Sequence, residues 1–184
     1  MTNATSLAVI SSNAFTYCEN LSSKGLPKSI EGIGQESFSN CKKLEIDLTA
    51  NGYPSLRSVG DFCFSSSALS IKSLPESLEI INGYAFSNLT RTSSLSEIPK
   101  NVIYIGGSAF TGSAIVPEDK ELLFSNPNIT ILDPSSGEQI GYSAETFKFY
   151  QGAYSKFIFV SEQSRQTAIN TNGFGSGVTT FEIN

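Results

Sequence analysis

One nine-residue pattern, present five times, constrains this chain more than any other feature. Each copy begins with an aliphatic residue, has Ile or Val at its fourth position and usually Gly at its fifth, and ends in a small residue and Phe. The copies are Leu7–Phe15, Ile30–Phe38, Leu56–Phe64, Leu78–Phe86 and Val102–Phe110. Their Phe residues are 23, 26, 22 and 24 positions apart. Self-similarity at this period predicts a solenoid, in which each coil buries its apolar side only by stacking on its neighbours.

A second constant feature, an aliphatic residue followed by Pro, comes after short segments in which apolar and polar residues alternate. Alternation with period two predicts a half-buried strand, and Pro ends it because Pro has no backbone donor. The predicted strands are Leu44–Leu48, Leu69–Ile71 and Leu95–Ile98. The prolines are residues 27, 75, 99 and 117, with a weaker copy at residue 54. Each coil should therefore contain a leucine-rich strand and a second extended piece that ends at the Ile–Gly pair.

The Gly and Phe of the pattern predict the rest of the coil. We expect Gly to let the backbone turn sharply, with a positive φ. The segment ending in Phe should be a tight helical or 3₁₀ turn that points the ring inward. The small residue before Phe fits a crowded position beside the next coil. The expected fold class is an α/β-type solenoid, mostly β, with short strands and short helical or 3₁₀ turns.

The domain prediction is a repeat array over residues 1–124 and a C-terminal capping region over residues 125–184. The repeat decays after residue 117, and a terminal unit must differ because its outer face meets water. Two insertions, Asp47–Tyr53 and Asn88–Ser94, should form rim loops, where solenoids often bind partners. The cap is expected to contain a hairpin over 128–142, a short helix over 144–153, a strand over 157–160, a helix over 162–169 capped by Ser161, and a last strand over 178–183.

The three cysteines fit the repeat without any chemical role. Cys18 and Cys41 each follow a repeat Phe by three positions, and Cys63 fills the small position before Phe64. We interpret all three as small buried apolar residues, and a Cys18–Cys41 disulfide as the less favoured alternative. Metal binding is not expected, since the chain has no CxxC motif and no His.

These motifs together resemble the BspA-type leucine-rich repeat, also called the Treponema-type class. That class has a leucine-rich strand, Ile/Leu-Pro, an Ile–Gly pair and Ala-Phe-x-x-Cys, and here the resemblance covers roughly residues 7–117. Cys18 and Cys41 match the cysteine of the class, whereas Ser67, Leu89 and Ser113 replace it and Asn82 replaces one Gly. The resemblance implies a curved right-handed leucine-rich repeat solenoid. It also implies a surface or secreted protein involved in adhesion or in binding host proteins.

Composition excludes several functions. The net charge of −5 provides no basic stripe for the phosphates of nucleic acid. The absence of His rules out Ser-His-Asp and Cys-His catalytic sets, so we expect no enzyme activity and no cofactor. No apolar run approaches about 20 residues, so direct membrane insertion is not expected. No signal peptide is evident, and because Leu7–Phe15 begins in the middle of a repeat we expect the chain to be a piece of a longer protein.

Two local motifs have competing interpretations. Glu45 with Asp47, and Glu118 with Asp119, are paired acids that suit a cation or acid–base chemistry, but alternating acids on a strand are usually its solvated side. Gly173–Gly177 is glycine-rich, yet no helix follows it, so a turn is the better interpretation than a phosphate-binding loop.

The remaining candidate site is the outward face of the leucine-rich strands. The residues expected to point outward between core positions are Glu45, Asp47, Ser70, Lys72, Ser96 and Glu97. Solenoids use such faces to bind partners, here a protein or a glycan. The alternatives are ordinary solvated positions on a structural spacer that displays other domains, or an enzyme site within the cap. The apolar residues Leu7, Val9 and Ile10 should also form an open edge suited to self-association.

Overall fold

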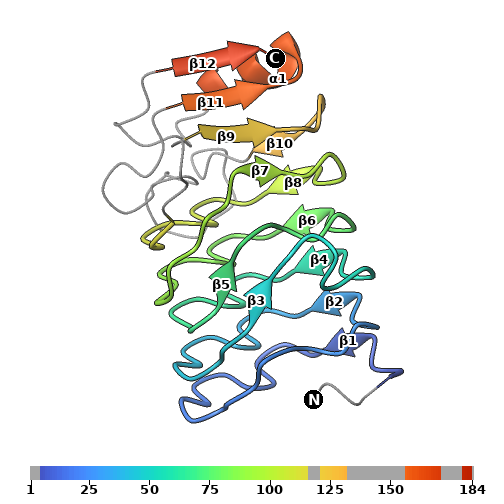
Figure 1. Ribbon diagram of the computed structural model, residues 1–184, viewed down its shortest axis with the longest axis vertical. Helices are drawn as coiled ribbons and strands as arrows, with labels where there is room; N and C mark the ends of the chain where they lie inside the picture. Colours follow the sequence, from blue (N-terminus) through green and yellow to red (C-terminus); the bar gives the residue numbers. More distant parts are fainter. Residues whose placement is uncertain (1–4, 116–120, 132–155, 171–179, 184) are drawn as a thin grey trace.

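The computed structural model describes residues 5–115, 121–131, 156–170 and 180–183. The chain is a mostly-strand parallel β-solenoid whose coils stack along one axis (Figure 1). One side is a six-stranded parallel sheet, the isoleucine sheet, with the order β1-β2-β4-β6-β8-β10. Its strands are β1 (Val9–Ile10), β2 (Gly32–Ile33), β4 (Ser58–Val59), β6 (Ile80–Ile81), β8 (Tyr104–Ile105) and β10 (Thr130–Ile131). The predicted solenoid and its short strands are confirmed.

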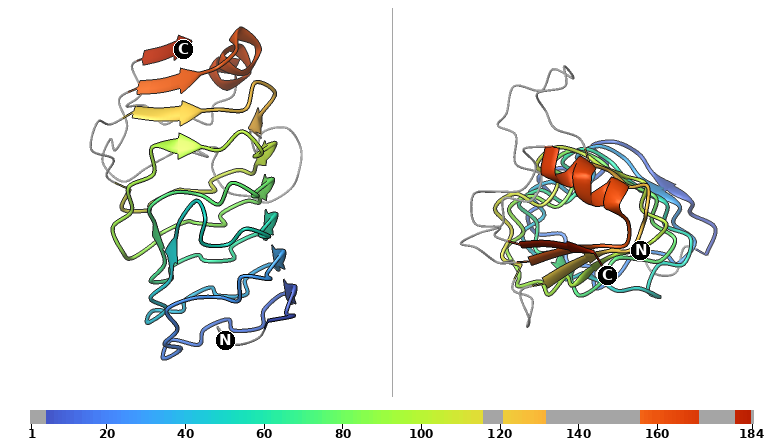
Figure 2. Two further views of the ribbon diagram at one scale, coloured as in Figure 1. Left: turned by 45° about the vertical axis from the view of Figure 1, so that its right-hand side comes forward. Right: turned by 90° about the horizontal axis from the view of Figure 1, so that it is seen from above.

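The leucine-rich strands form two further parallel sheets, which we call the leucine sheets. The N-terminal one pairs β3 (Asp47–Leu48) with β5 (Ser70–Ile71). The C-terminal one has the order β12-β11-β9-β7. Its strands are β7 (Glu97–Ile98), β9 (Glu121–Phe124), β11 (Lys156–Phe159) and β12 (Thr180–Ile183). Figure 2 shows that the isoleucine sheet and the leucine sheets form separate sides of the stack.

The break between the leucine sheets coincides with the insertion Asn88–Ser94. Within it, Ser94 N donates to Ile71 O at 2.8 Å, and Ser93 forms an isolated parallel bridge with Ile115. These contacts continue the column of β3 and β5. Strand β7 begins at Glu97, four residues after Ser93, and starts a new column. The insertion therefore lies inside the stack and divides the leucine-strand side, instead of forming only a rim loop.

Phenylalanine rings form a continuous column through the core. Phe38, Phe64, Phe86 and Phe110 are fully buried, and Phe15 packs against them. Neighbouring ring centroids lie 5.2–5.9 Å apart with the planes within 19° of parallel. Each buried ring removes a large apolar surface from water and contributes roughly 1.5–3 kcal/mol by area.

The segment before and after each Phe is a tight turn, as predicted, but its hydrogen bonds alternate in direction. In the second coil Ser37 N donates to Gly34 O three residues back, whereas Phe38 N donates to Cys63 O in the next coil, at 2.8 Å. The residue two positions before Phe has a positive φ in every copy, for example Glu36 at 54°. This conformation interrupts the 3₁₀ pattern and frees alternate amides to bind the neighbouring coil.

The prediction of positive φ for the repeat glycines is wrong. Among the described glycines only Gly112 has a positive φ, of 70°. A Cβ on Gly60 would lie 2.5 Å from Gln35 N, and one on Gly106 would lie 2.5 Å from Gly83 N. Glycine is needed because neighbouring coils approach closely at this position, not because the backbone turns left-handed.

The cysteine position is also explained by hydrogen bonding. Cys41 Sγ donates to Phe15 O in the previous coil at 3.0 Å. Ser113, at the corresponding position, donates through Oγ to Phe86 O in its previous coil. Ser67 instead donates to Phe64 O within its own coil, at 2.7 Å. Serine therefore replaces the cysteine as a small buried donor to a turn carbonyl.

The thiols are all free, and Cys41 and Cys63 are buried as predicted. Cys18 is exposed, which corrects its interpretation as a buried residue: it belongs to the first described coil, and no described coil covers it. Burial raises the pKa of Cys41 to about 11 and that of Cys63 well above its ordinary value. Both buried thiols are therefore neutral near pH 7 and suit packing, not nucleophilic chemistry.

The C-terminal part continues the parallel stack. The first arm of the predicted hairpin is β10, which pairs in parallel with β8. Strand β11 lies one residue earlier than predicted, and α1 (Glu162–Asn170) follows it, with Ser164 N donating to Ser161 Oγ at 3.2 Å as the predicted cap requires. Helix α1 packs against β10, β11 and β12 at the end of the stack (Figure 2).

The remaining elements of the predicted cap fall largely outside the described residues. These are the second arm of the hairpin, the helix over 144–153 and the glycine-rich segment. The boundary between array and cap at residues 124/125 stays a prediction, although the hydrogen bonds between β9 and β11 cross it.

Candidate functional site

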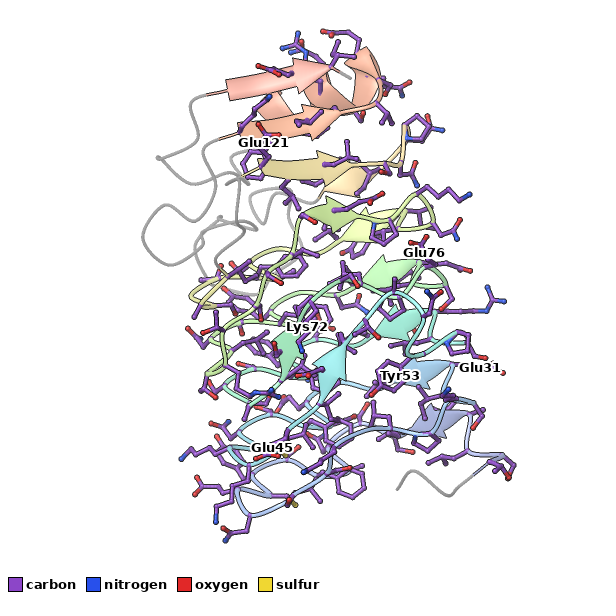
Figure 3. The ribbon with its side chains drawn as sticks, in the orientation of Figure 1. Glu31, Glu45, Tyr53, Lys72, Glu76 and Glu121 are labelled. Carbon is purple, nitrogen blue, oxygen red and sulfur yellow. The ribbon has the colours of Figure 1, made fainter. Side chains whose placement is uncertain are left out.

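The outward face of the leucine sheets carries the residues predicted for binding, but they lie in two separate groups. Alternation along the strands sends one set of side chains into the core and the other set outward, as in β9 and β11, where every second residue is buried. Asp47 lies on β3 of the N-terminal leucine sheet, and Glu45 and Lys72 lie close to the ends of its strands (Figure 3). Glu97 lies on β7 of the C-terminal sheet, and Ser96 directly precedes it.

Asp47 is the centre of the N-terminal group. Its carboxylate lies 3.1 Å from Lys72 Nζ and 2.9 Å from an Arg91 guanidinium nitrogen. Partial burial raises the pKa of Asp47, but Lys72 and Arg91 outweigh it, and the pKa lies below its ordinary value. In this Asp47–Lys72–Arg91 cluster the carboxylate is therefore ionised near pH 7 and lies against two basic side chains.

Arg91 holds this cluster in place across three coils. Its guanidinium also lies 3.4 Å from the backbone carbonyl oxygens of Ile46 and Ala68. Arg91 and Asp47 belong to the two insertions found in the sequence, so the structure brings the two insertions together. Sequence reasoning identified both insertions but did not name Arg91, because the contact joins residues 44 positions apart.

An open hollow of about 610 Å³ lies beside the cluster. Two of its lysines are fixed by neighbouring side chains: Lys42 Nζ lies 2.6 Å from Glu19 Oε1, and Lys43 Nζ donates to Asn20 Oδ1 at 2.7 Å. The predicted residue Glu45 borders the hollow. The full lining is Ser22, Lys42, Lys43, Glu45, Ala68, Thr90 and Arg91.

Ser70 does not belong to the outward face, which corrects its prediction as a binding residue. It is only 3 % exposed, and its Oγ donates to Thr92 O at 2.7 Å. Thr92 lies in the insertion 88–94, which packs over β5. The insertion thus covers a position that the alternation of the strand would have left in water.

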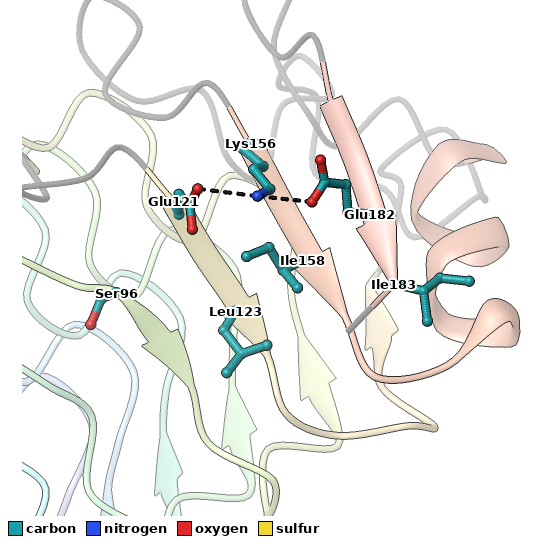
Figure 4. Close-up of a pocket in the computed structure, with 7 residues that line it drawn as sticks. All are labelled: Ser96, Glu121, Leu123, Lys156, Ile158, Glu182 and Ile183. Carbon is teal, nitrogen blue, oxygen red and sulfur yellow. Dashed lines mark hydrogen bonds and ion pairs between the residues drawn. The ribbon is translucent and has the colours of Figure 1, made fainter.

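A second, smaller hollow of about 310 Å³ lies on the C-terminal leucine sheet (Figure 4). Lys156 crosses it, with Nζ 3.2 Å from Glu121 Oε1 and 2.8 Å from Glu182 Oε2. Hydrogen bonds from Lys156 to Glu182 and Glu121 raise the pKa of Lys156 above its ordinary value. The lining is Ser96, Glu121, Leu123, Lys156, Ile158, Glu182 and Ile183, of which only Ser96 was predicted.

The remaining predicted residue, Glu97, is exposed and accepts a hydrogen bond from Ser125 Oγ. Among the described residues, the acids of the sheet face either form ion pairs with basic side chains or lie apart from one another. Glu45 borders the N-terminal hollow. Asp47 is ionised, and its negative charge is paired with Lys72 and Arg91. Glu121 and Glu182 converge, but Lys156 lies between them and the hollow is open to water, which suits an ion-pair row.

The described residues contain neither a metal-binding cluster nor a membrane-spanning helix. Within the described ranges, no group of three or more Cys, Asp or Glu side chains is placed to hold a metal ion. The described helix is too short and too polar to cross a membrane. Glu118, Asp119 and the glycine-rich segment 173–177 lie outside the described residues.

Comparison with known proteins agrees with this fold. The family model described as BspA type leucine rich repeat region matches residues 8–121 in six copies, one more than the five Phe-ended units. The chain belongs to this family. Its repeats are typical of protein-interaction or adhesion modules, commonly of surface or secreted proteins, and the family is typically non-enzymatic. No curated protein and no solved structure gives a significant match.

Proposed function

We propose that this chain is a non-enzymatic binding module of a surface or secreted protein, and that it engages a protein or glycan partner through the outward face of the leucine sheets. The observation that carries the proposal is that the constant and the variable residues of each coil lie in different places. The constant residues are used in packing, whereas the outward face holds fixed charges beside two open hollows.

The Asp47–Lys72–Arg91 cluster supports this proposal because its charges are held in position before any partner arrives. Preordered side chains lose less conformational entropy on binding than free ones do. Complementary charges also speed association and reject partners of the wrong charge pattern. Ser70 is no longer part of the proposed surface, whereas Glu45, Asp47 and Lys72 remain.

The test compares two charge-matched triple variants of the full chain on arrays of immobilised extracellular proteins and glycans. Glu45→Ala, Asp47→Ala and Lys72→Ala together should abolish binding to the proteins or glycans that the wild-type chain captures. Lys28→Ala, Glu31→Ala and Glu76→Ala change the same charges at exposed positions elsewhere, as Figure 3 shows for Glu31 and Glu76, and should leave binding unchanged.

The main alternative is a structural spacer that only displays other domains. The uninterrupted isoleucine sheet and phenylalanine column are the features that favour it, since they would suit a stiff rod. A spacer predicts no specific capture on either array. If the first triple variant binds as well as the wild type, the proposed face is wrong even where a partner exists.

A further inference from the structure

Four neighbouring strands of the C-terminal leucine sheet place an acid, two aliphatic residues and a second acid in one row. Glu97 of β7 is in register with Leu123 of β9, Leu123 with Ile158 of β11, and Ile158 with Glu182 of β12. The two acids are exposed and the two aliphatic residues are partly exposed. Because neighbouring strands lie about 4.8 Å apart, the row spans about 14 Å along the solenoid axis.

The aliphatic pair is part of the floor of the C-terminal hollow. Figure 4 shows Leu123 and Ile158 side by side, with Lys156 bridging Glu121 and Glu182 along one border. Partly exposed aliphatic side chains inside a charged border have the layout of a small interface, with an apolar centre and a polar rim. An isolated apolar residue on a surface would need no such explanation.

The charge around this pair is negative. Glu97, Glu121 and Glu182 supply three carboxylates, and Lys156 supplies one ammonium group. The Asp47–Lys72–Arg91 cluster on the N-terminal leucine sheet has the opposite balance, with one carboxylate and two cations. The C-terminal hollow is therefore complementary to a partner that brings an aliphatic side chain together with cations.

We propose that this row binds an extended segment of a partner protein in which an aliphatic residue lies between two basic ones, in the pattern Lys/Arg-x-aliphatic-x-Lys/Arg. In an extended chain, residues i, i+2 and i+4 point to the same side, and the first and fifth are about 13 Å apart. That length matches the span between Glu97 and Glu182. The central side chain then lies over Leu123 and Ile158. This inference rests on the proposed binding function of the leucine-sheet face and specifies the partner for its C-terminal half.

A second folded copy of this chain is not the occupant. The chain has one close match to the pattern in the described residues, Lys24-Gly-Leu-Pro-Lys28. Its central residue, Leu26, is only 3 % exposed and belongs to the hydrophobic core. A folded copy cannot present this leucine, so the described residues of a second copy cannot supply the segment.

The test measures the binding of fluorescent peptides to the full chain by anisotropy. The probe is Lys-Ser-Leu-Ser-Lys between glycine linkers, and the controls are Glu-Ser-Leu-Ser-Glu and Lys-Ser-Ser-Ser-Lys in the same linkers. At millimolar concentration the first peptide should bind most tightly, the serine peptide Lys-Ser-Ser-Ser-Lys should bind more weakly through its charges, and the acidic peptide should not bind; binding of the first should weaken as salt is raised. Glu97→Gln with Glu182→Gln should weaken it about fivefold, as expected for two solvent-exposed charge pairs. The matched pair Glu31→Gln with Glu76→Gln should not change it.

A further variant, Leu123→Ser, tests the apolar centre. It should remove the preference for the leucine peptide over the serine peptide while leaving the weak attraction of both for the acids. Thermal unfolding of each variant checks that the chain remains folded. Absence of binding to the wild-type chain, or equal binding of all three peptides, would overturn the proposal. Either result would leave the Asp47–Lys72–Arg91 cluster and the array experiment untouched, so the two proposals can fail separately.

Discussion

The isoleucine sheet and the leucine sheets belong to the same coils but differ in regularity. The isoleucine sheet runs through six strands without a break, and every pair within it is parallel. The leucine side is split into sheets of two and four strands by an insertion that packs inside the stack. The repeat therefore keeps one side uniform for packing and leaves the other side free to vary. The Asp47–Lys72–Arg91 cluster and the two hollows described above lie on the variable side.

The largest expected effect concerns the phenylalanine column. Phe64→Ala should reduce the free energy of unfolding by about 3–5 kcal/mol, because it removes a fully buried ring from between two stacked neighbours. Phe62, two residues earlier, is half-buried and lies outside the phenylalanine column. Its ring stacks on that of Tyr84, with the ring centroids 4.6 Å apart. Phe62→Ala should cost roughly 1 kcal/mol, on the scale of a single aromatic pair. Urea unfolding measures both, and equal costs would contradict the division between inner column and outer stack.

A second comparison tests why the repeat needs glycine. Gly60→Ala should cost about 1–3 kcal/mol, because its Cβ would lie 2.5 Å from Gln35 N and 2.6 Å from Gly34 C, and backbone atoms cannot move aside easily. Gly32→Ala would meet only the Ser58 hydroxyl, at 3.2 Å, and should cost well under about 1 kcal/mol. Differential scanning calorimetry on the two variants gives the comparison. A larger loss for Gly32→Ala would mean that close approach of the coils does not explain the repeat glycine.

A smaller effect is expected on the variable side, where Asp47 is partly exposed. The folded-state pKa of Asp47 is below its ordinary value, so its ionised form stabilises the fold above about pH 4 and this contribution is lost as the pH falls through the folded value. Asp47→Asn should reduce the free energy of unfolding by no more than about 1 kcal/mol at pH 7, since solvent screens the pairs with Lys72 and Arg91. The deficit should shrink in unfolding curves recorded at pH 3. A deficit that stays constant with pH would show that the carboxylate charge is not the cause.

The smallest effect on folding is expected at the edge of the isoleucine sheet. Val9 on β1 is 59 % exposed and Leu7 is 36 % exposed, whereas Ile10, predicted to be uncovered, is buried at 4 %. We predict that Val9→Lys lowers any self-association of the chain at high concentration without changing its unfolding midpoint. Light scattering over a concentration series measures this, with Lys28→Ala as an exposed control. A wild-type chain that stays monomeric throughout would contradict the predicted edge pairing.

The parts of the fold that repeat were predictable from the sequence, because each coil meets nearly the same environment. The spacing of the five Phe residues predicted the stack, and the alternating residues before each Pro predicted the leucine-rich strands. Features that depend on contacts between unlike coils were not predictable. Arg91 reaches two coils back to Ile46 O, and Thr92 covers Ser70, and neither contact has a local signature in the sequence.

The glycine positions show a different limit. The repeat pattern indicated that Gly34, Gly60 and Gly106 are structurally required. Two physical reasons would give this same pattern: a left-handed φ, and a close approach of neighbouring backbones. Only the distances decide between them, and they favour close approach. The acidic and aliphatic row on the C-terminal sheet was missed for a related reason. Its register joins residues 97, 123, 158 and 182, and the 35 positions between residues 123 and 158 exceed the repeat period.

The most direct test of the central claim, that the constant half of each coil packs and the variable half binds, is amide NMR of the full chain with and without a ligand captured on the array. Chemical-shift changes should be concentrated on the leucine-sheet face, at residues 42–48, 68–72 and 89–97. The isoleucine sheet should change little. Changes concentrated at residues 32–34, 58–60, 80–82 and 104–106 would contradict this claim, because they would place the ligand on the isoleucine sheet.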